Sequence, residues 1–539
     1  MPVLESAART VEGGEQGTRT TRLWTSPFAI AGVLYAAVTL VHEIASFRAC
    51  DGHFVYPVDD AYILMAMAKN LALHGIWGVT PFGFSGSSSS LLFPLLMAGL
   101  YRIVGITDYL PLVLSWISGL AAIYVAGRIL SRFLEPKLQT VLLILFVLCP
   151  PLFVLGILGM EHSLHLLLTL LFLDLFLKDD VPAWQAIAIS TTMVAARYEG
   201  LFFIAPACVI LAAQRKWKAA LSIAMGAAIP VCTYAAFSVA HGNYWLPQSV
   251  ALKGAQTRSK SIAGTVWDLL HRAKMNSGDG PWLVLLLIAL AASALSVAGR
   301  KWSRTALPLV VVFVAGCLHL CLAGVGRMSR YEDYLIGAGI VAIGCAFPTI
   351  LKRTSRMTFT MLWILFCAAG ISLLLRASVP AMLLPACARA IYAQQMQMAR
   401  FVRTYYPRGS VAANDVGAIS YYSDIHCLDV VGLASPEVFF ARRRGVYTTD
   451  YLQTLAVAQH VQLAIVYDSW FSPERPDLLG IAVPPDWVRV ARWSLPQMLQ
   501  QGGKTVSFYA VVPGETEHLR SALQEFALTL PKEVTVTQN

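Results

Sequence analysis

Charged residues are scarce in this chain, because Asp, Glu, Lys and Arg together make up 13% of its 539 residues while 57% are hydrophobic. So little charge excludes an ordinary soluble protein, and the mean hydropathy of +0.60 is typical of a polytopic membrane protein. The net charge of +10 comes from short basic clusters between apolar runs, not from one broad basic face. That distribution indicates membrane topology and excludes nucleic acid as a partner.

The sequence also lacks metal-binding cysteine patterns and internal repeats. None of its ten cysteines belongs to a CxxC pair or a Cys/His spacing suited to zinc, and most lie inside apolar runs as small hydrophobic residues. The one low-complexity segment, SGSSSS at residues 85–90, predicts a loop that leads into a surface helix. Nothing in the sequence therefore indicates a metal-stabilised fold or a repeat architecture.

What the chain does contain is a series of apolar runs, which predicts about eleven membrane spans with the N-terminus inside. Residues 1–25 are expected to form a cytoplasmic tail, followed by an uncleaved signal anchor. Several of the later runs fall short of the roughly 20 residues that a full span usually needs. The runs lie near residues 28–47, 109–127, 139–155, 162–177, 182–196, 200–214, 219–240, 281–298, 305–325, 335–351 and 357–377.

The apolar stretch at residues 90–105 decides the orientation of everything after it. If it lies along the membrane surface, the basic clusters SRFLEPK, RKWK at Arg215, RKWSR at Arg300 and KRTSR at Lys352 all fall on the side of the N-terminus. Loops rich in Lys and Arg are normally cytoplasmic. We therefore predict a transmembrane domain at residues 26–377, whose first outer loop, residues 48–108, holds interfacial helices.

From about residue 378 the pattern changes to short apolar strands separated by helical and turn-rich stretches. The strand candidates lie within SVAANDVGAISYYSD, CLDVVGL, QLAIVYD and SFYAVVP. This pattern predicts a soluble α/β domain at residues 378–539, on the outer side of the membrane.

Two adjacent carboxylates, Asp59 and Asp60, precede an apolar segment with Ile63, Met67 and Leu71 at helical spacing, which predicts an interfacial helix. One interpretation is that either carboxylate only caps the start of this helix. The other is that one of them, partly desolvated, acts as a general base toward a substrate hydroxyl. Because the adjacent like charges repel each other, we expect one of them to act as the base and the other to bind a cation or orient the acceptor.

Three further charged residues, Glu161, Arg197 and Glu199, lie at the outer ends of short spans. Charges in an apolar chain are costly unless they are paired or used, so these residues are site candidates. The alternative is a structural Arg/Glu pair between helices or snorkelling at the interface. The histidines beside Glu161 have no further ligand nearby and are expected to pack between helices.

Basic residues also occur in predicted outer loops, against the positive-inside bias. These are Lys253, Arg327 and Arg330. A phosphate at the membrane surface would explain them, because Arg offers a bidentate fork and Lys a point charge that stabilise a phosphate leaving group. Contact with anionic lipid headgroups is the alternative.

Seven short motifs occur in a fixed order along the chain: DDAYI at 59–63, KNLALHG at 69–75, GSSSSLL at 86–92, GME at 159–161, RYEG at 197–200, NDVGAISYY at 414–422 and DVVGL at 429–433. With them the chain resembles the GT-C superfamily of polyprenyl-phosphate-sugar-dependent glycosyltransferases, most closely the mycobacterial arabinofuranosyltransferase branch. It departs from that branch at Ala66-Met67, Ser90 and Tyr198. The departures leave the sugar open between arabinofuranose and mannose.

The resemblance implies an inverting glycosyltransferase of the bacterial inner (plasma) membrane. Its donor would be a polyprenyl-phosphate sugar, its acceptor a hydroxyl of an envelope glycan or glycolipid, and its surroundings membrane lipids. The basic residues would grip the donor phosphate, and Asp60, with Asp59 second, would activate the acceptor. Glu161, Arg197 and Glu199 would orient the acceptor or brace the pocket. No cofactor is certain, and a divalent cation stays open because family members differ.

Two other classes of protein would also have many spans. A transporter or flippase of lipid-linked precursors would more naturally show an internal repeat and charges near the bilayer midplane. A scaffold that recognises cell-wall polymer through its soluble domain would leave the outer carboxylates of the membrane part without a use.

Overall fold

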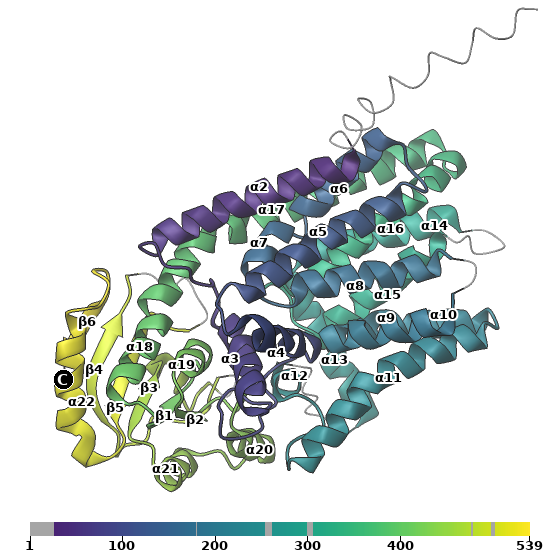
Figure 1. The fold of residues 1–539 in the computed structure, drawn as a ribbon. Helices are drawn as coiled ribbons and strands as arrows, with labels where there is room; N and C mark the ends of the chain where they lie inside the picture. Colours follow the sequence, from purple (N-terminus) through teal and green to yellow (C-terminus); the bar gives the residue numbers. More distant parts are fainter. Residues whose placement is uncertain are drawn as a thin grey trace, which may run out of the picture.

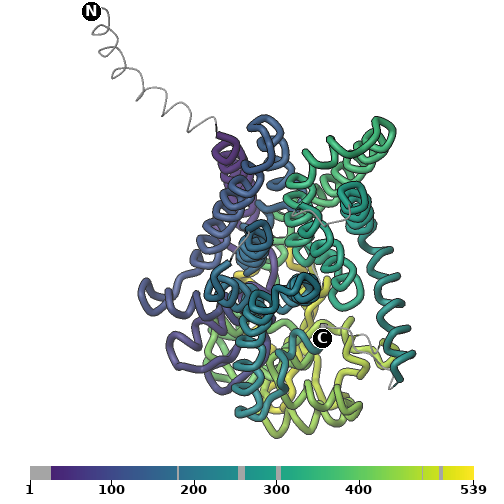
Figure 2. Tube along the Cα trace, turned by 90° about the vertical axis from the view of Figure 1, so that its right-hand side faces the viewer, coloured from purple at the N-terminus to yellow at the C-terminus, as the bar shows by residue number. Residues whose placement is uncertain are grey.

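The chain folds into a bundle of apolar helices and a domain built on a β-sheet, which covers one end of the bundle (Figures 1 and 2). The computed structural model describes residues 26–178, 181–253, 261–298, 305–475, 478–496 and 502–538. The helix bounds of the bundle are α2 (Pro27–Ala49), α5 (Leu110–Leu130), α6 (Pro136–Leu148), α7 (Leu152–Ile157), α8 (His162–Phe176), α9 (Ala183–Ala196), α10 (Leu201–Ala213), α11 (Trp217–Ala240), α12 (Gln248–Lys253), α13 (Ile262–Asp279), α14 (Pro281–Val297), α15 (Ala306–Leu322), α16 (Asp333–Arg353) and α17 (Arg356–Ala393).

Long apolar helices identify a multi-pass membrane protein. Within the described ranges, five helices are long and apolar enough to cross a membrane, or six if the bent pair of α13 and α14 counts as one span. Each of the eleven predicted runs contains a helix, but several, such as α9 with 14 residues, extend only about 20 Å at 1.5 Å per residue. The total of about eleven spans therefore stays a prediction.

Two helices of the first loop, α3 (Asp59–His74) and α4 (Leu92–Val104), lie between the bundle and the sheet domain (Figure 1). The sequence predicts that α3 rests in the membrane interface with one apolar face buried. In the structure almost every residue from Asp59 to Ala68 is buried, because α3 packs against α4 on one side and against a helix of the sheet domain on the other. Its surroundings are therefore protein on both sides.

The sheet domain has six strands in the order β2-β1-β3-β5-β4-β6. Strand β1 runs parallel to β2 and β3, and the remaining neighbours are antiparallel. The central strand β3 is buried along its whole length, as its sequence LAIV requires. The bounds are β1 (Ser410–Ala413), β2 (His426–Asp429), β3 (Leu463–Val466), β4 (Val488–Ser494), β5 (Thr505–Ala510), β6 (Thr535–Gln538), α18 (Gln395–Tyr405), α19 (Gly417–Tyr422), α20 (Pro436–Arg444), α21 (Thr449–Ala458) and α22 (Thr516–Ala527).

The helical and sheet parts are joined by α17, a single helix of 38 residues. The predicted domain boundary at residue 378 lies inside this helix, which continues through Pro380 and Pro385 to Ala393. Along its length, Arg376 contacts the bundle, while Arg389 pairs with Asp51 of the first loop and with Glu533 of the sheet domain. A continuous helix with contacts to both parts holds the sheet domain in a fixed position over the bundle.

Candidate active site

Asp60 and Arg330, which are 270 residues apart in the sequence, form an ion pair at the end of the bundle that the sheet domain covers. Asp60 lies in the first turn of α3, where its carboxylate remains 30% exposed, whereas Arg330 is 4% exposed. Burial alone would disfavour the charged guanidinium, but the charge of Asp60 raises the pKa of Arg330. The predicted base and a predicted phosphate-binding residue are therefore direct partners.

Two nitrogen atoms of the Arg330 guanidinium, Nη1 and Nε, make no strong hydrogen bond. Its Nη1 points at the thioether sulfur of Met160 at 3.0 Å, and thioethers are weak acceptors. Its Nε has no hydrogen-bond partner among the described residues. A guanidinium that contacts Asp60 and Tyr331, but whose Nη1 faces a weak acceptor and whose Nε is unused, has donors left for a second anion.

The loop that carries Arg330 has an unusual backbone. Gly326, Arg327, Met328 and Ser329 all have positive φ, between 54° and 86°. Side-chain-bearing residues rarely adopt this conformation unless their surroundings impose it. The turn leaves Arg327 exposed at the surface and directs Arg330 inward.

A buried ion pair imposes this turn. Glu332, fully buried, accepts from the backbone N–H of Gly326 at 3.0 Å and from Trp282 Nε1 at 3.2 Å, and it pairs with Arg376 at 2.9 Å. Arg376 in turn donates to the carbonyl of Ser329 at 2.8 Å. Together the two side chains hold both ends of the strained turn and thereby place Arg330 opposite Asp60.

Arg197 joins the other predicted residues to this loop. Its guanidinium donates to Glu161 Oε1 at 2.6 Å and to Glu199 Oε1 at 2.7 Å. The ring of Tyr331 lies between two guanidiniums, 5.3 Å from that of Arg330 and 5.7 Å from that of Arg197. Five of the predicted site residues thus form one network, whose members are Asp60, Arg330, Arg197, Glu161 and Glu199.

Next to Arg197 lie carboxylate oxygens that the fold leaves unsatisfied. Glu161 Oε2 and both oxygens of Asp333 have no hydrogen-bond partner within the described part of the chain, and each residue is 1% exposed. The ring of His162 lies close by, with Nδ1 3.9 Å from Asp333 Oδ1. Buried unsatisfied acceptors are costly, so this polar cluster beneath Tyr331 is a feature that stability alone does not explain.

Asp59 has a different position from its neighbour. It is 7% exposed, and its two oxygens accept hydrogen bonds from the backbone N–H groups of Gly417 at 2.6 Å and Ala418 at 2.8 Å. It therefore caps α19 of the sheet domain and forms no side-chain cap on its own helix. Burial, and then the nearby charge of Asp415, raise the pKa of the Asp59 carboxyl well above 3.8.

The motif NDVGAISYY is the surface that meets α3. A Cβ added at Gly417 would lie 2.5 Å from Asp59 Oδ2, so only glycine permits this approach. The hydroxyls of Tyr421 and Tyr422 both donate to the carboxylate of Asp108 at 2.8 Å. The motif thus docks the sheet domain onto the first loop.

This docking occupies the edge of the sheet where α/β proteins usually bind ligands. Ligands normally lie beyond the carboxyl ends of parallel strands, where neighbouring connections diverge. Strand β1 ends at Ala413 between β2 and β3, and beyond it Asp415 and Gly417 face Asp59. At this edge, the described residues beyond β1 therefore contact α3 of the same chain.

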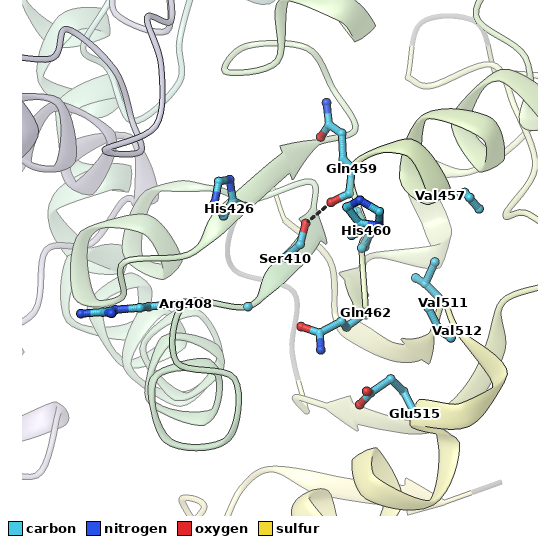
Figure 3. Close-up of a pocket in the computed structure, with 12 residues that line it drawn as sticks. Arg408, Ser410, His426, Val457, Gln459, His460, Gln462, Val511, Val512 and Glu515 are labelled. Carbon is cyan, nitrogen blue, oxygen red and sulfur yellow. Dashed lines mark hydrogen bonds between the residues drawn. The ribbon is translucent and has the colours of Figure 1, made fainter.

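The sheet domain also contains a cavity of about 670 Å³ at the amino ends of its parallel strands (Figure 3). Ser410, His426 and Gln462 belong to its wall, and Ser410 Oγ donates to the carbonyl of Gln459 at 2.9 Å. None of the residues in the Asp60 network lines this cavity. It is therefore separate from the candidate active site.

Three predicted residues lie outside the network: Asp59, which caps α19, and the two basic residues Arg327 and Lys253. Arg327 is exposed on the strained turn, and the side chain of Lys253 lies outside the part of the chain that the structure describes. Within that described part, no group of three or more His, Cys, Asp or Glu side chains is placed to hold a metal ion.

Sequence reasoning missed several residues that build the site: Met160, Tyr331, Glu332, Asp333 and Arg376. Three of them directly follow the predicted Arg330 in RYED. Charge in a predicted outer loop, the signal that selected the two arginines, could therefore also have selected the two acids beside them. Arg376 had a weaker signal, a lone cation near the end of the last apolar run. Its role became visible only when the fold brought it to Ser329.

Comparison with known proteins gives one family match, which is confined to the sheet domain. A family model described as a domain of unknown function (DUF8728) matches residues 389–509. No curated protein sequence matches the chain.

Several solved structures are similar at low identity. The crystal structure of ArnT from Cupriavidus metallidurans bound to undecaprenyl phosphate is 14% identical with a TM-score of 0.48, over 89% of this chain and 98% of that one. The apo Archaeoglobus fulgidus oligosaccharyltransferase is 12% identical with a TM-score of 0.46, over 89% of this chain and 74% of that one.

The cryo-EM structure of the arabinofuranosyltransferase AftD from Mycobacteria is 14% identical with a TM-score of 0.41, over 89% of this chain and 40% of AftD. All three TM-scores are below 0.5, so these likenesses carry no argument about what this chain does. At 12–14% identity, the activity has to be argued from the residues of this chain.

Proposed function

We propose that the chain is an inverting glycosyltransferase that moves a sugar from a polyprenyl phosphate to a hydroxyl of an envelope glycan or glycolipid. The observation that carries the proposal is the pairing of Asp60 with Arg330 beside the Arg197 network. One partly exposed carboxylate can accept a proton, and one guanidinium with spare donors can hold a phosphate. The reaction needs both groups in the same place.

Asp60 is the proposed general base. The carboxylate takes the proton of the acceptor hydroxyl as the acceptor oxygen bonds to the anomeric carbon of the donor. The bond between that carbon and the phosphate oxygen breaks on the opposite face, and polyprenyl phosphate leaves with the electron pair. A single displacement of this kind inverts the configuration at the anomeric carbon.

Arg330 is the proposed phosphate-binding residue. Donors aimed at the leaving group stabilise the negative charge that develops on its oxygen. Arg327 on the same turn, and Lys253, are proposed to add to that stabilisation. Glu161, Arg197 and Glu199 are proposed to brace the sugar-binding side of the pocket. No step needs a divalent cation, although one could assist the leaving group.

Asp59 is proposed as a positioning residue, because both of its oxygens bind the backbone of α19. The cap keeps the first turn of α3 fixed against the sheet domain. Since Asp60 follows directly in that turn, the cap also fixes the direction in which the Asp60 carboxylate points. Sequence reasoning ranked Asp59 as the second candidate base, and its contacts favour this positioning role.

The site is proposed to face the outer side of the membrane, with the N-terminus in the cytoplasm and the sheet domain outside. Three of the four basic clusters support this orientation, because they lie at the end of the bundle away from Asp60. Arg128 and Arg132 are at the carboxyl end of α5, Arg215 is between α10 and α11, and Lys352 is at the end of α16. The cluster at Arg300 lies outside the described residues.

The proposal is tested with membranes that carry the wild type, Asp60→Asn or Asp424→Asn. Each is given a radiolabelled polyprenyl-phosphate sugar, either arabinofuranose or mannose, and an acceptor glycan. Asp424 is an exposed carboxylate that pairs with Lys69 near the far end of α3, so its variant is the matched control. Transfer by the wild type and the control, with loss in Asp60→Asn, is expected. No transfer by the wild type with either donor would instead favour a transporter.

A further inference from the structure

A second cavity, of about 770 Å³, lies at the end of the bundle away from Asp60. Its wall is formed where α8 and α10 end and where α9, α11 and α15 begin. Helix α9 runs from Ala183 at this cavity to the residue before Arg197 at the candidate active site. Its 14 residues separate the two places by about 20 Å. The cavity is therefore distinct from the site described above.

The mouth of this cavity is basic. Lys178, Arg215, Lys216 and Lys218 belong to its lining, and among the described lining residues there is no Asp or Glu. The nearest described acid, Asp174, is buried and shared between Arg128, Arg132 and Lys178. In the sequence, the six cations Arg128, Arg132, Lys178, Arg215, Lys216 and Lys218 outnumber Asp174 and the two acids that directly follow Lys178, Asp179 and Asp180, which lie outside the described residues.

The inner wall is apolar. Phe176, Leu211 and Ile223 lie on it, while Trp217 is 65% exposed beside the cations. Tryptophan with lysine and arginine at the end of apolar helices is typical of the level of lipid headgroups. A volume of this size is also within the range of small-ligand pockets. The cavity thus combines a cationic mouth with an apolar interior.

The turn that presents three of the cations uses an unexpected residue. Lys216 N–H donates to the carbonyl of Leu211 at 2.9 Å and Arg215 N–H to that of Ala212 at 2.9 Å, which is the Schellman ending of a helix. The left-handed position of this motif is normally glycine, but here it is Arg215, with φ of 61°. A charged side chain thus occupies a position that glycine would adopt with less strain.

We propose that this cavity binds the phosphate-bearing headgroup of an anionic membrane lipid, with the lipid chains along the apolar wall between α10 and α11. The cations neutralise the phosphate, and Trp217 lies at the boundary between headgroup and chains. The inference does not depend on the proposed transferase activity. It concerns a structural lipid at the opposite end of the bundle.

The test uses the full chain in a non-ionic detergent, titrated with phosphatidylglycerol or phosphatidylcholine and followed by native mass spectrometry. Lys216→Gln/Lys218→Gln removes two cations of the cavity. Lys352→Gln/Arg356→Gln removes two exposed cations at the same end that do not line it. A third variant, Arg215→Gly, removes a cation and relieves the backbone strain, so weaker lipid binding in this variant is not a sign of misfolding.

Phosphatidylglycerol is expected to bind in preference to phosphatidylcholine, and the cavity variants are expected to weaken it about tenfold, against less than about threefold in the control pair. Equal weakening in both pairs would overturn the proposal, because it would show general attraction to a basic surface. So would unchanged binding in the cavity variants. An added arm with inorganic phosphate separates a lipid from a free anion, since full displacement of phosphatidylglycerol by phosphate would overturn the lipid assignment.

Discussion

Truncation of Asp59 gives the most specific prediction about how the two parts of the chain fit together. Asp59→Ala removes the acceptor of two backbone N–H groups, those of Gly417 and Ala418. Each buried amide left without a partner costs about 1–3 kcal/mol. Entry of water and relief of the repulsion with Asp415 offset part of this cost. The docked position of α19 should therefore lose about 2 kcal/mol.

Hydrogen exchange measures this loss directly. A difference of about 2 kcal/mol corresponds to about 30-fold faster exchange, because each 1.4 kcal/mol is about tenfold. We expect that acceleration in peptides that contain Tyr421 and Tyr422, whose hydroxyls hold the same interface. Asp60→Ala is the matched control, since it truncates the adjacent carboxylate, which contacts Arg330 instead.

The comparison of Asp59→Ala with Asp60→Ala decides whether the Asp59 cap holds the interface. If Asp59→Ala and Asp60→Ala exchange at the same rate in these peptides, the cap does not hold the sheet domain. The proposed division of work between the two aspartates would then lose its physical basis.

Three more predictions follow from the same contacts. Gly417→Ala should undock α19 as Asp59→Ala does, because the new Cβ would lie 2.5 Å from Asp59 Oδ2. Limited proteolysis should therefore cut the sheet domain of this variant faster than that of Gly514→Ala, where the added Cβ meets open space. Glu332→Gln should cost about 3 kcal/mol of unfolding free energy by breaking the buried pair with Arg376, and a double-mutant cycle in thermal unfolding should show coupling between the two residues. Burial raises the pKa of both Asp59 and Asp415 above the ordinary value of 3.8. Docking of α19 on α3 should therefore be most stable below pH 3.8, and it should weaken as the pH rises through the pKa values that the two carboxyls have in the folded protein. Asp415→Asn should flatten the dependence seen by exchange at several pH values, and an unchanged dependence would contradict it.

Much of the fold could be predicted because apolar runs and strand patterns are local. A helix lies at each of the eleven predicted runs, strands β1 and β3 lie within two of the four predicted stretches, and β2 and β5 overlap the other two. Strands β4 and β6 were missed, since VRVARWS carries two arginines and TVTQ is short and polar. The domain boundary at 378 fell inside α17 because the last apolar run ends near residue 377, whereas the helix continues through Pro380 and Pro385 to Ala393.

The candidate site could be predicted only in part, because charge in an apolar chain marks individual residues but not their partners. Glu161, Arg197 and Glu199 were selected because unpaired charges are costly in an apolar chain, Asp60 as one of two carboxylates before an apolar helix, and Arg330 as a cation of an outer loop. The structure brings these five residues into one network. The contact between Asp59 and α19 joins residues about 360 positions apart, and a local sequence pattern cannot reveal a contact over that distance. The same holds for Arg376 and the strained turn at Ser329.

Single-turnover transfer by Asp60→Asn, with donor binding measured on the same protein, decides whether Asp60 is the general base. If Asp60 is the base, transfer should fall by about 10²-fold or more, the range in which a general base contributes. Binding of the polyprenyl-phosphate donor should remain, since Arg330 keeps its charge and loses only a competing partner. Transfer within about threefold of the wild type would contradict the account, because a neutral amide cannot take the proton of the acceptor.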